Sequence, residues 1–146
     1  MEIGRHSLVL PMKPKKAFLS IKFHSDNRNR AIIESICEAL SAVGFNTNVV
    51  VRDIEDWGEI NLPSQELMKR SFNLIDKCQV VFVECSQKGM GVGIEAGYAF
   101  ARGKPIVVLA KKGTELSNTL SGIANEVFYY SHPSELSVLI ESLLFL

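Results

Sequence analysis

Two short apolar runs, residues 79–83 and 105–110, constrain the fold of this chain more than any other feature. Each run has the length and the unbroken hydrophobicity of a strand that is buried on both faces. The segment between them contains residues 91–101, which have the composition of a helix. Two strands joined through a helix lie parallel in one sheet, with a right-handed connection. The sequence therefore predicts a parallel sheet whose faces are covered by helices.

The same alternation of strand and helix continues along the chain. Three more runs have the pattern of strands, at residues 17–21, 45–51 and 127–130. A helix is expected after each of these strands, and the three helices are expected to begin at Asp26, Pro63 and Ser131. Gly44 is expected to end the first helix. We predict an α/β, flavodoxin-like (Rossmann-like) three-layer sandwich with a five-stranded parallel sheet in the order 2-1-3-4-5. In that order, the loops after Ile21 and Glu84 border the ligand crevice.

Size and charge limit the function classes. The chain has 146 residues, 47% of them hydrophobic, which suits one domain around a sheet with two buried faces. Residues 16–146 are expected to form this domain, and residues 1–15 a flexible arm. The 16 basic and 16 acidic side chains cancel, which argues against a nucleic-acid binder that works through a basic surface. A small polar ligand is the better expectation.

Cysteine usage and hydropathy favour a cytoplasmic protein. Cys37, Cys78 and Cys85 are an odd number without metal-ligand or redox spacing, so reduced thiols are expected. The three histidines are scattered, and no metal site is expected. No apolar run approaches the roughly 18 residues that cross a bilayer, and no signal-peptide pattern is found. We expect neither membrane binding nor a cofactor.

Glu95 is the candidate functional carboxylate. It lies in the first turns of the helix after the third strand, and Gly91 and Gly93 beside it let the backbone approach a ligand closely. Ligands of open parallel sheets bind beyond the carboxyl ends of the strands, where this helix begins. The helix dipole alone also favours a glutamate here. The pattern by itself leaves both interpretations open.

Four segments together resemble the nucleoside 2-deoxyribosyltransferase family: residues 17–20, 80–84, 91–99 and 103–106. The similarity is greatest to the family's 2'-deoxynucleoside 5'-monophosphate N-hydrolase branch. It implies cleavage of the N-glycosidic bond of a nucleoside or nucleotide, as a hydrolase or a deoxyribosyltransferase. In that family, the glutamate matched by Glu95 is the nucleophile on the sugar C1'. A carboxylate in this role forms a glycosyl-enzyme intermediate, as in retaining glycosidases.

The candidate substrate-binding residues are Ser20, Lys22, Ser71, Ser86, Gly91, Gly93, Ser117 and Asn118, with Lys22 expected to act as a point charge at the end of the first strand. Residues 116–122 resemble the segment that binds the 5'-phosphate in the monophosphate hydrolases. There, the serine matched by Ser117 reaches in from the neighbouring subunit. A homodimer is therefore expected, and the apolar tail 143–146 is a candidate contact surface. Ser117 also fits the role of a turn or helix cap.

Two positions depart from the family pattern. Leu19 precedes Ser20 where the family has a glycine, which reduces backbone access to a phosphate. Ser71 stands where the family has an aspartate that assists the leaving base, and a hydroxyl cannot act as that acid at neutral pH. Loss of general acid catalysis lowers a rate by about 10² to 10⁴. Four carboxylates are candidates to replace the aspartate: Asp53, Asp56, Glu59 and Glu84.

The departure at Ser71 leaves two other functions open. TIR-type domains resemble the chain more weakly, and some of them hydrolyse NAD. Nicotinamide in NAD is already a cationic leaving group, so its release needs no acid. The third interpretation is a catalytically inactive nucleotide-binding module that serves as a sensor or in assembly. Release of a free base would distinguish either enzyme from this module.

Overall fold

The structure of this protein, a computed structural model, describes residues 15–145. The arm predicted at residues 1–15 lies outside this range except for Lys15, and the side chains of the predicted contact tail beyond Leu143 lie outside it too. The domain division at residue 16 therefore stays a prediction.

Strands and helices alternate along the described chain, with three short 3-10 turns labelled η. The elements are β1 (Lys15–Ser20), α2 (Arg30–Ala42), β2 (Phe45–Asn48), α3 (Val50–Asp53), η1 (Asp56–Gly58), α4 (Ser64–Lys77), β3 (Val80–Glu84), α5 (Met90–Ala101), β4 (Ile106–Lys111), α6 (Asn118–Ser121), β5 (Glu126–Tyr130), η2 (Pro133–Glu135), α7 (Leu136–Glu141) and η3 (Ser142–Phe145).

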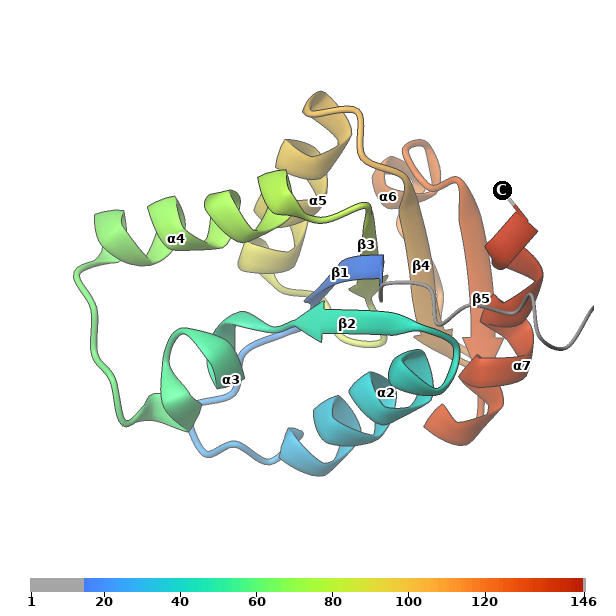
Figure 1. Cartoon of the computed structure of the whole chain (residues 1–146), viewed down its shortest axis with the longest axis horizontal. Helices are drawn as coiled ribbons and strands as arrows, with labels where there is room; N and C mark the ends of the chain where they lie inside the picture. Colours follow the sequence, from blue (N-terminus) through green and yellow to red (C-terminus); the bar gives the residue numbers. More distant parts are fainter. Residues whose placement is uncertain (1–14, 146) are drawn as a thin grey trace, which may run out of the picture.

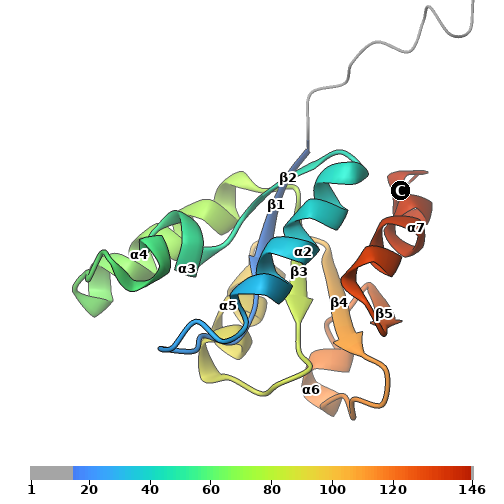
Figure 2. The ribbon, with the colours of Figure 1, turned by 90° about the horizontal axis from the view of Figure 1, so that it is seen from below.

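The five strands form one sheet in the order β2-β1-β3-β4-β5, and every neighbouring pair is parallel. The predicted topology is confirmed. Figure 1 shows α4 and α5 on one face of the sheet and α2 and α7 on the other, and Figure 2 shows the same layers from below. The connections that leave β1 and β3 run to opposite sides, which opens a crevice beyond the carboxyl ends of these two strands.

Successive residues of the central strands enter two separate cores. Leu19 and Phe82 pack with α2 and α7, whereas Phe18 and Val81 pack with α4 and α5. Side chains alternate between the faces of a strand, so a strand covered on both faces must be apolar at every position. This explains why β3 and β4 are nearly unbroken apolar runs in the sequence.

Two predicted boundaries are wrong. The first helix begins at Arg30 and not at Asp26, because the Asp26 carboxylate binds the backbone N–H and the guanidinium of Arg28 in the preceding turn. The second predicted strand, 45–51, ends at Asn48, and the chain turns into α3. Gly44 follows α2 with φ +95°, and ends that helix as predicted.

The turn into α3 has a local cause. The Asp53 carboxylate accepts a hydrogen bond from the backbone N–H of Val49 at 2.8 Å and thereby caps the first turn. Val49 and Val51 are both buried. A run of valines has strand propensity, but this burial on a helical turn outweighs it.

Candidate active site

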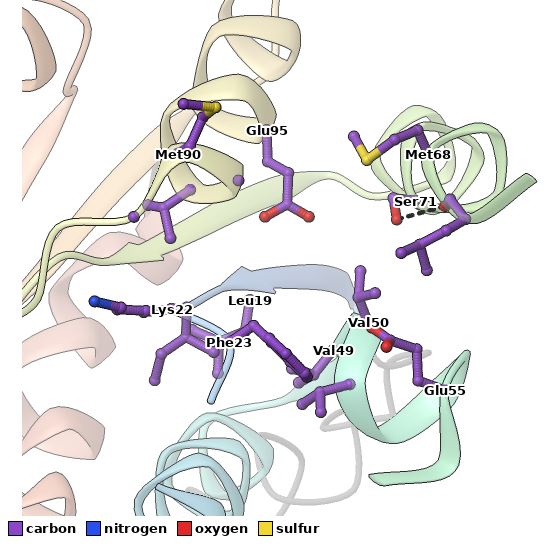
Figure 3. A pocket seen from close by; sticks show the side chains of 16 residues that line it. Leu19, Lys22, Phe23, Val49, Val50, Glu55, Met68, Ser71, Met90 and Glu95 are labelled. Atoms are coloured by element: carbon purple, nitrogen blue, oxygen red, sulfur yellow. Dashed lines mark hydrogen bonds between the residues drawn. The ribbon is translucent and has the colours of Figure 1, made fainter. Parts of the chain in front are cut away.

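A cavity of about 390 Å³ lies beyond the carboxyl ends of β1 and β3. The end of β1 and the loop after it, α3, α4 and the start of α5 surround it (Figure 3). Its lining is mostly apolar, and the ionisable side chains among its lining residues are Lys22, Glu55 and Glu95. An apolar pocket of this size with a few polar groups is typical of a small-molecule site.

Glu95 extends into this cavity from the second turn of α5, as Figure 3 shows. Its carboxylate oxygen Oε1 accepts a hydrogen bond from Ser20 Oγ at 2.7 Å. Ser20 is the last residue of β1 and is only 1% exposed. The hydrogen bond therefore joins the end of a central strand to the helix that carries the carboxylate.

The surroundings of Glu95 change its acidity. Burial raises the pKa of Glu95 to about 7, while the Ser20 hydroxyl lowers this pKa and the charge of Glu55 raises it. Desolvation disfavours the charged form, and a hydrogen bond to the carboxylate favours it. A carboxyl group that titrates near neutral pH in a cavity is a candidate for catalysis.

Lys22 lies at the edge of the cavity, in the loop after β1. The Asn29 side chain donates a hydrogen bond to the Lys22 carbonyl at 2.9 Å, which holds this loop. Gly89 faces the Lys22 stem, because a Cβ at position 89 would lie 3.4 Å from Lys22 Cγ. Lys22 also lines a neighbouring cavity of about 380 Å³, together with Ser86.

Ser71 faces inward from α4, as predicted, and is 1% exposed. Its hydroxyl donates a hydrogen bond to the Leu67 carbonyl at 2.8 Å, drawn as a dashed line in Figure 3. The hydroxyl proton is thus used within the helix. Ser71 contributes to the cavity wall but does not direct its proton to a ligand.

The other predicted residues are divided between the Glu95 cavity, a second cavity and the surface. Gly91 lines the same cavity. Gly93 and Ser117 line a second cavity of about 470 Å³ between α5 and the segment around α6. Ser117 caps α6, because its Oγ accepts a hydrogen bond from the Leu120 N–H at 3.2 Å. Asn118 is exposed at the first position of α6.

The four carboxylates considered as replacements for the missing aspartate are engaged or exposed elsewhere, and none lines the Glu95 cavity. Glu84 is buried and accepts hydrogen bonds from the Ser86 N–H and the Tyr130 hydroxyl. Asp53 pairs with Arg52. Asp56 and Glu59 are exposed.

Glu55 is the cavity carboxylate that the sequence analysis missed. It follows α3, and Figure 3 shows it on the wall of the cavity across from Glu95. Burial raises the pKa of Glu55. The predicted second strand extended to residue 51, and the sequence pattern assigned no role to Glu55. The available signal was the i, i+4 spacing of Val51 and Glu55, which one helical turn places on the same side.

Within residues 15–145, no three His, Cys, Asp or Glu side chains come together in the way that a metal ion requires. Over the same part of the chain, no helix has the length and hydrophobicity to cross a membrane.

Comparisons with known proteins bear on the family and the fold. A family model described as nucleoside 2-deoxyribosyltransferase matches residues 20–133. A protein from Thermofilum pendens, named as a candidate 2'-deoxynucleoside 5'-phosphate N-hydrolase, is 29% identical over 132 residues, which are 88% of this chain and 92% of that protein.

Two solved structures have the same fold. The CMP N-glycosidase BcmB of Clostridium botulinum superimposes with a TM-score of 0.65 at 20% identity, over 90% of this chain and 100% of that chain. A 2-deoxyribosyltransferase from Bacillus psychrosaccharolyticus gives a TM-score of 0.65 at 14% identity, over 84% of this chain and 90% of that chain.

Proposed function

Because the chain belongs to the nucleoside 2-deoxyribosyltransferase family, it is an enzyme that cleaves N-glycosidic bonds, and we propose that Glu95 is its nucleophile. The substrate is a nucleoside or deoxynucleoside, or the 5'-monophosphate of either. The single observation that carries the proposal is the half-buried Glu95 carboxylate, which Ser20 orients into the cavity at the carboxyl ends of β1 and β3.

In the first step, the ionised Glu95 carboxylate attacks C1' of the sugar and the C1'–N bond breaks, with its electron pair passing to the base. Positive charge develops on the sugar, and the adjacent carboxylate stabilises it. The mostly apolar lining strengthens this attraction, because charges interact more strongly where water is excluded. Ser20 binds Oε1, which leaves Oε2 to form the bond.

In the second step, an acceptor attacks C1' and releases the Glu95 carboxylate. The acceptor is water in a hydrolase and a second base in a transferase. Both outcomes use the same nucleophile and the same intermediate. The products therefore distinguish hydrolysis from transfer: a free sugar or sugar phosphate forms in the first case and a new nucleoside or nucleotide in the second.

We assign the two ends of the substrate to the two ends of the cavity. Figure 3 shows Lys22 at one end, on the side of Met90, where α5 begins. The Lys22 ammonium and the backbone that begins this helix suit a sugar hydroxyl or a phosphate. Figure 3 shows Val50 and Met68 at the other end, and Leu67 also lines the cavity. These apolar side chains suit the faces of a base.

We further propose a homodimer in which Ser117 serves the site of the neighbouring subunit. Within one subunit, Ser117 is exposed and lines a different cavity from Glu95, so a second copy would have to bring it to a bound phosphate. Mixing inactive Ser117→Ala and Glu95→Gln dimers tests this, because each mixed dimer would regain one intact site. Random exchange would restore about a quarter of the sites, and no recovery after exchange would contradict the shared site.

We also propose that the enzyme works in the cytoplasm. The support is its cysteine chemistry: Cys37, Cys78 and Cys85 are all free thiols in the structure. Free thiols are typical of a reducing compartment.

The test is a chromatographic assay of free-base release. The panel contains ribonucleosides, deoxynucleosides, their 5'-monophosphates and NAD, each with and without a second base as acceptor. We expect release by the wild-type enzyme and loss of release in Glu95→Gln. Glu126→Gln is the control, since this carboxylate is exposed at the start of β5.

Each result has a clear meaning. Release from monophosphates without an acceptor would identify a hydrolase, and a new nucleoside formed with the acceptor would identify a transferase. Release from NAD alone would favour the glycohydrolase alternative. Binding of nucleotides without release would overturn the proposal and favour an inactive module.

A further inference from the structure

We propose that Glu55 is the general acid that protonates the leaving base, in the role that Ser71 cannot fill. This inference rests on the proposed function of Glu95. It assigns opposite tasks to the two carboxylates of one cavity: Glu95 attacks the sugar and Glu55 serves the base.

The cavity has few ionisable groups. Among the described residues that line it, only Lys22, Glu55 and Glu95 carry ionisable side chains. Figure 3 shows the Lys22 side chain directed away from the labelled apolar residues, whereas Glu55 lies next to Val50. Glu55 is thus the ionisable group beside the apolar end, where the base is assigned.

Glu55 is firmly held by hydrogen bonds of its backbone. Its N–H donates to the Val50 carbonyl at 3.1 Å, and its carbonyl accepts hydrogen bonds from the N–H groups of Gly58 at 3.0 Å and Ile60 at 2.9 Å. A group that transfers a proton must be held in position by its surroundings. These three bonds hold the backbone at Glu55 from both sides of the turn.

The turn is also tied to the loop after β1. Asn27 Nδ2 donates to the Trp57 carbonyl at 2.8 Å. The Arg30 guanidinium lies over the Trp57 ring, 4.4 Å from its centroid. The segment that carries Glu55 is therefore connected to the segment that carries Ser20 and Lys22, on the same side of the crevice.

The residues that follow Glu55 have an unusual backbone conformation. Asp56 and Trp57 have φ of +45° and +55°, a left-handed conformation that residues other than glycine rarely adopt, and Gly58 follows with φ +97°. Such conformations gather at functional sites, where the surrounding structure enforces them. Here the result is a sharp turn that leaves Glu55 at the cavity and Asp56 exposed.

The two steps of the reaction balance, because Glu55 gives up one proton in the first step and recovers one in the second. In the first, the Glu55 carboxylic acid gives its proton to a nitrogen or oxygen of the base while the C1'–N bond breaks, its electron pair goes to the base, and Glu95 forms the new C1'–O bond. In the second, the oxygen of water bonds to C1', Glu95 leaves as a carboxylate, and Glu55 takes the proton of that water. The net reaction adds one water to the substrate and restores both side chains.

The electrostatics agree with a shared proton. The Glu55 charge raises the pKa of Glu95, so the two carboxyl groups disfavour being ionised together. Burial also raises the pKa of Glu55, which favours its protonated form. A base that covers Glu55 removes water from its carboxylate, and positive charge on the sugar favours ionised Glu95. Both effects move the proton to Glu55.

The experiment compares Glu55→Gln with the wild-type enzyme on two kinds of substrate. The first is the monophosphate that the wild-type enzyme cleaves fastest. The second is an N7-methylated purine nucleoside 5'-monophosphate, whose base is already cationic and needs no acid. We expect Glu55→Gln to lower kcat about 10² to 10⁴-fold on the first and less than about threefold on the second. Glu59→Gln is the matched control, because Glu59 is exposed in the same turn.

The outcomes separate this inference from the proposed function. Equal losses on both substrates, or no loss on either, would overturn the role of Glu55. Glu95→Gln must abolish release from both substrates, since both need the nucleophile. If Glu95→Gln remains active, or if the wild-type enzyme releases no base from either substrate, the proposed function fails and the role of Glu55 fails with it.

Discussion

Ser20 Oγ lies 2.7 Å from Glu95 Oε1, and this hydrogen bond joins residues that are 75 positions apart in the chain. It acts against burial, which raises the pKa of Glu95 to about 7. The two effects together leave a carboxylate that is partly ionised at neutral pH and is held in one orientation. A nucleophile in a mostly apolar cavity needs both properties.

Ser20→Ala should move the pH dependence of base release. Without the hydroxyl, the pKa of Glu95 rises above about 7. Hydrogen bonds to charged groups contribute about 1.5 to 3 kcal/mol, which corresponds to about one to two pH units. The rising limb of kcat/KM against pH should shift upward by about that amount, with a loss of roughly tenfold at pH 7. A lower rate with an unshifted pH profile would contradict the prediction.

Glu95→Gln should stabilise the folded protein at alkaline pH. The folded-state pKa of Glu95 is about 7, above its ordinary value of 4.5. Between these values the unfolded chain releases its proton while the folded chain keeps it, so wild-type stability falls as pH rises through this window. Above about pH 7, the free energy of unfolding of the wild-type protein is lower by about 3 kcal/mol than at the acid end of this window.

Urea unfolding from pH 4 to pH 8 checks this prediction. The free energies of unfolding of Glu95→Gln and the wild-type protein should converge at the acid end and differ by about 3 kcal/mol at pH 8. A difference that does not change with pH would mean that another group sets the stability.

Ser71→Ala should have little effect. The Ser71 hydroxyl donates to the Leu67 carbonyl of its own helix, so its removal should cost about 1 kcal/mol or less. We expect kcat and KM to change less than about threefold, as measured on the fastest substrate. A hundredfold loss of kcat with normal stability would show instead that the hydroxyl touches the substrate.

Tyr130→Phe should lower stability without lowering activity. The Tyr130 hydroxyl donates to Glu84 Oε2 at 3.2 Å, and both side chains are buried. Removing the donor leaves a buried carboxylate oxygen without this partner, which costs about 1 to 3 kcal/mol. Thermal unfolding measures the expected loss of stability, and the base-release assay measures the expected unchanged activity. Loss of kcat in a variant of unchanged stability would place Glu84 in the reaction.

Much of the fold could be predicted from the local pattern of apolar residues in the sequence. The parallel pairing was predicted correctly because the buried strands β3 and β4 leave apolar runs and helices between strands favour parallel connections. The observed strand order is the flavodoxin-like order that was predicted for such a sheet. The main error was at residues 45–51, where valines suggested strand to the end. Val49 and Val51 are instead buried at a helical turn that Asp53 caps, and a propensity pattern does not contain that information.

The sequence by itself determined the sheet, the two layers of helices, and the place of Glu95 on the helix after β3. Only the tertiary structure decided which side chains meet there. Ser20 binds Glu95, Ser71 turns to its own helix, and Glu55 lines the cavity in place of the four carboxylates that sequence reasoning considered. Periodicity places a residue on a face of its own element, whereas contacts between distant residues depend on how those elements pack and where each turn directs the chain.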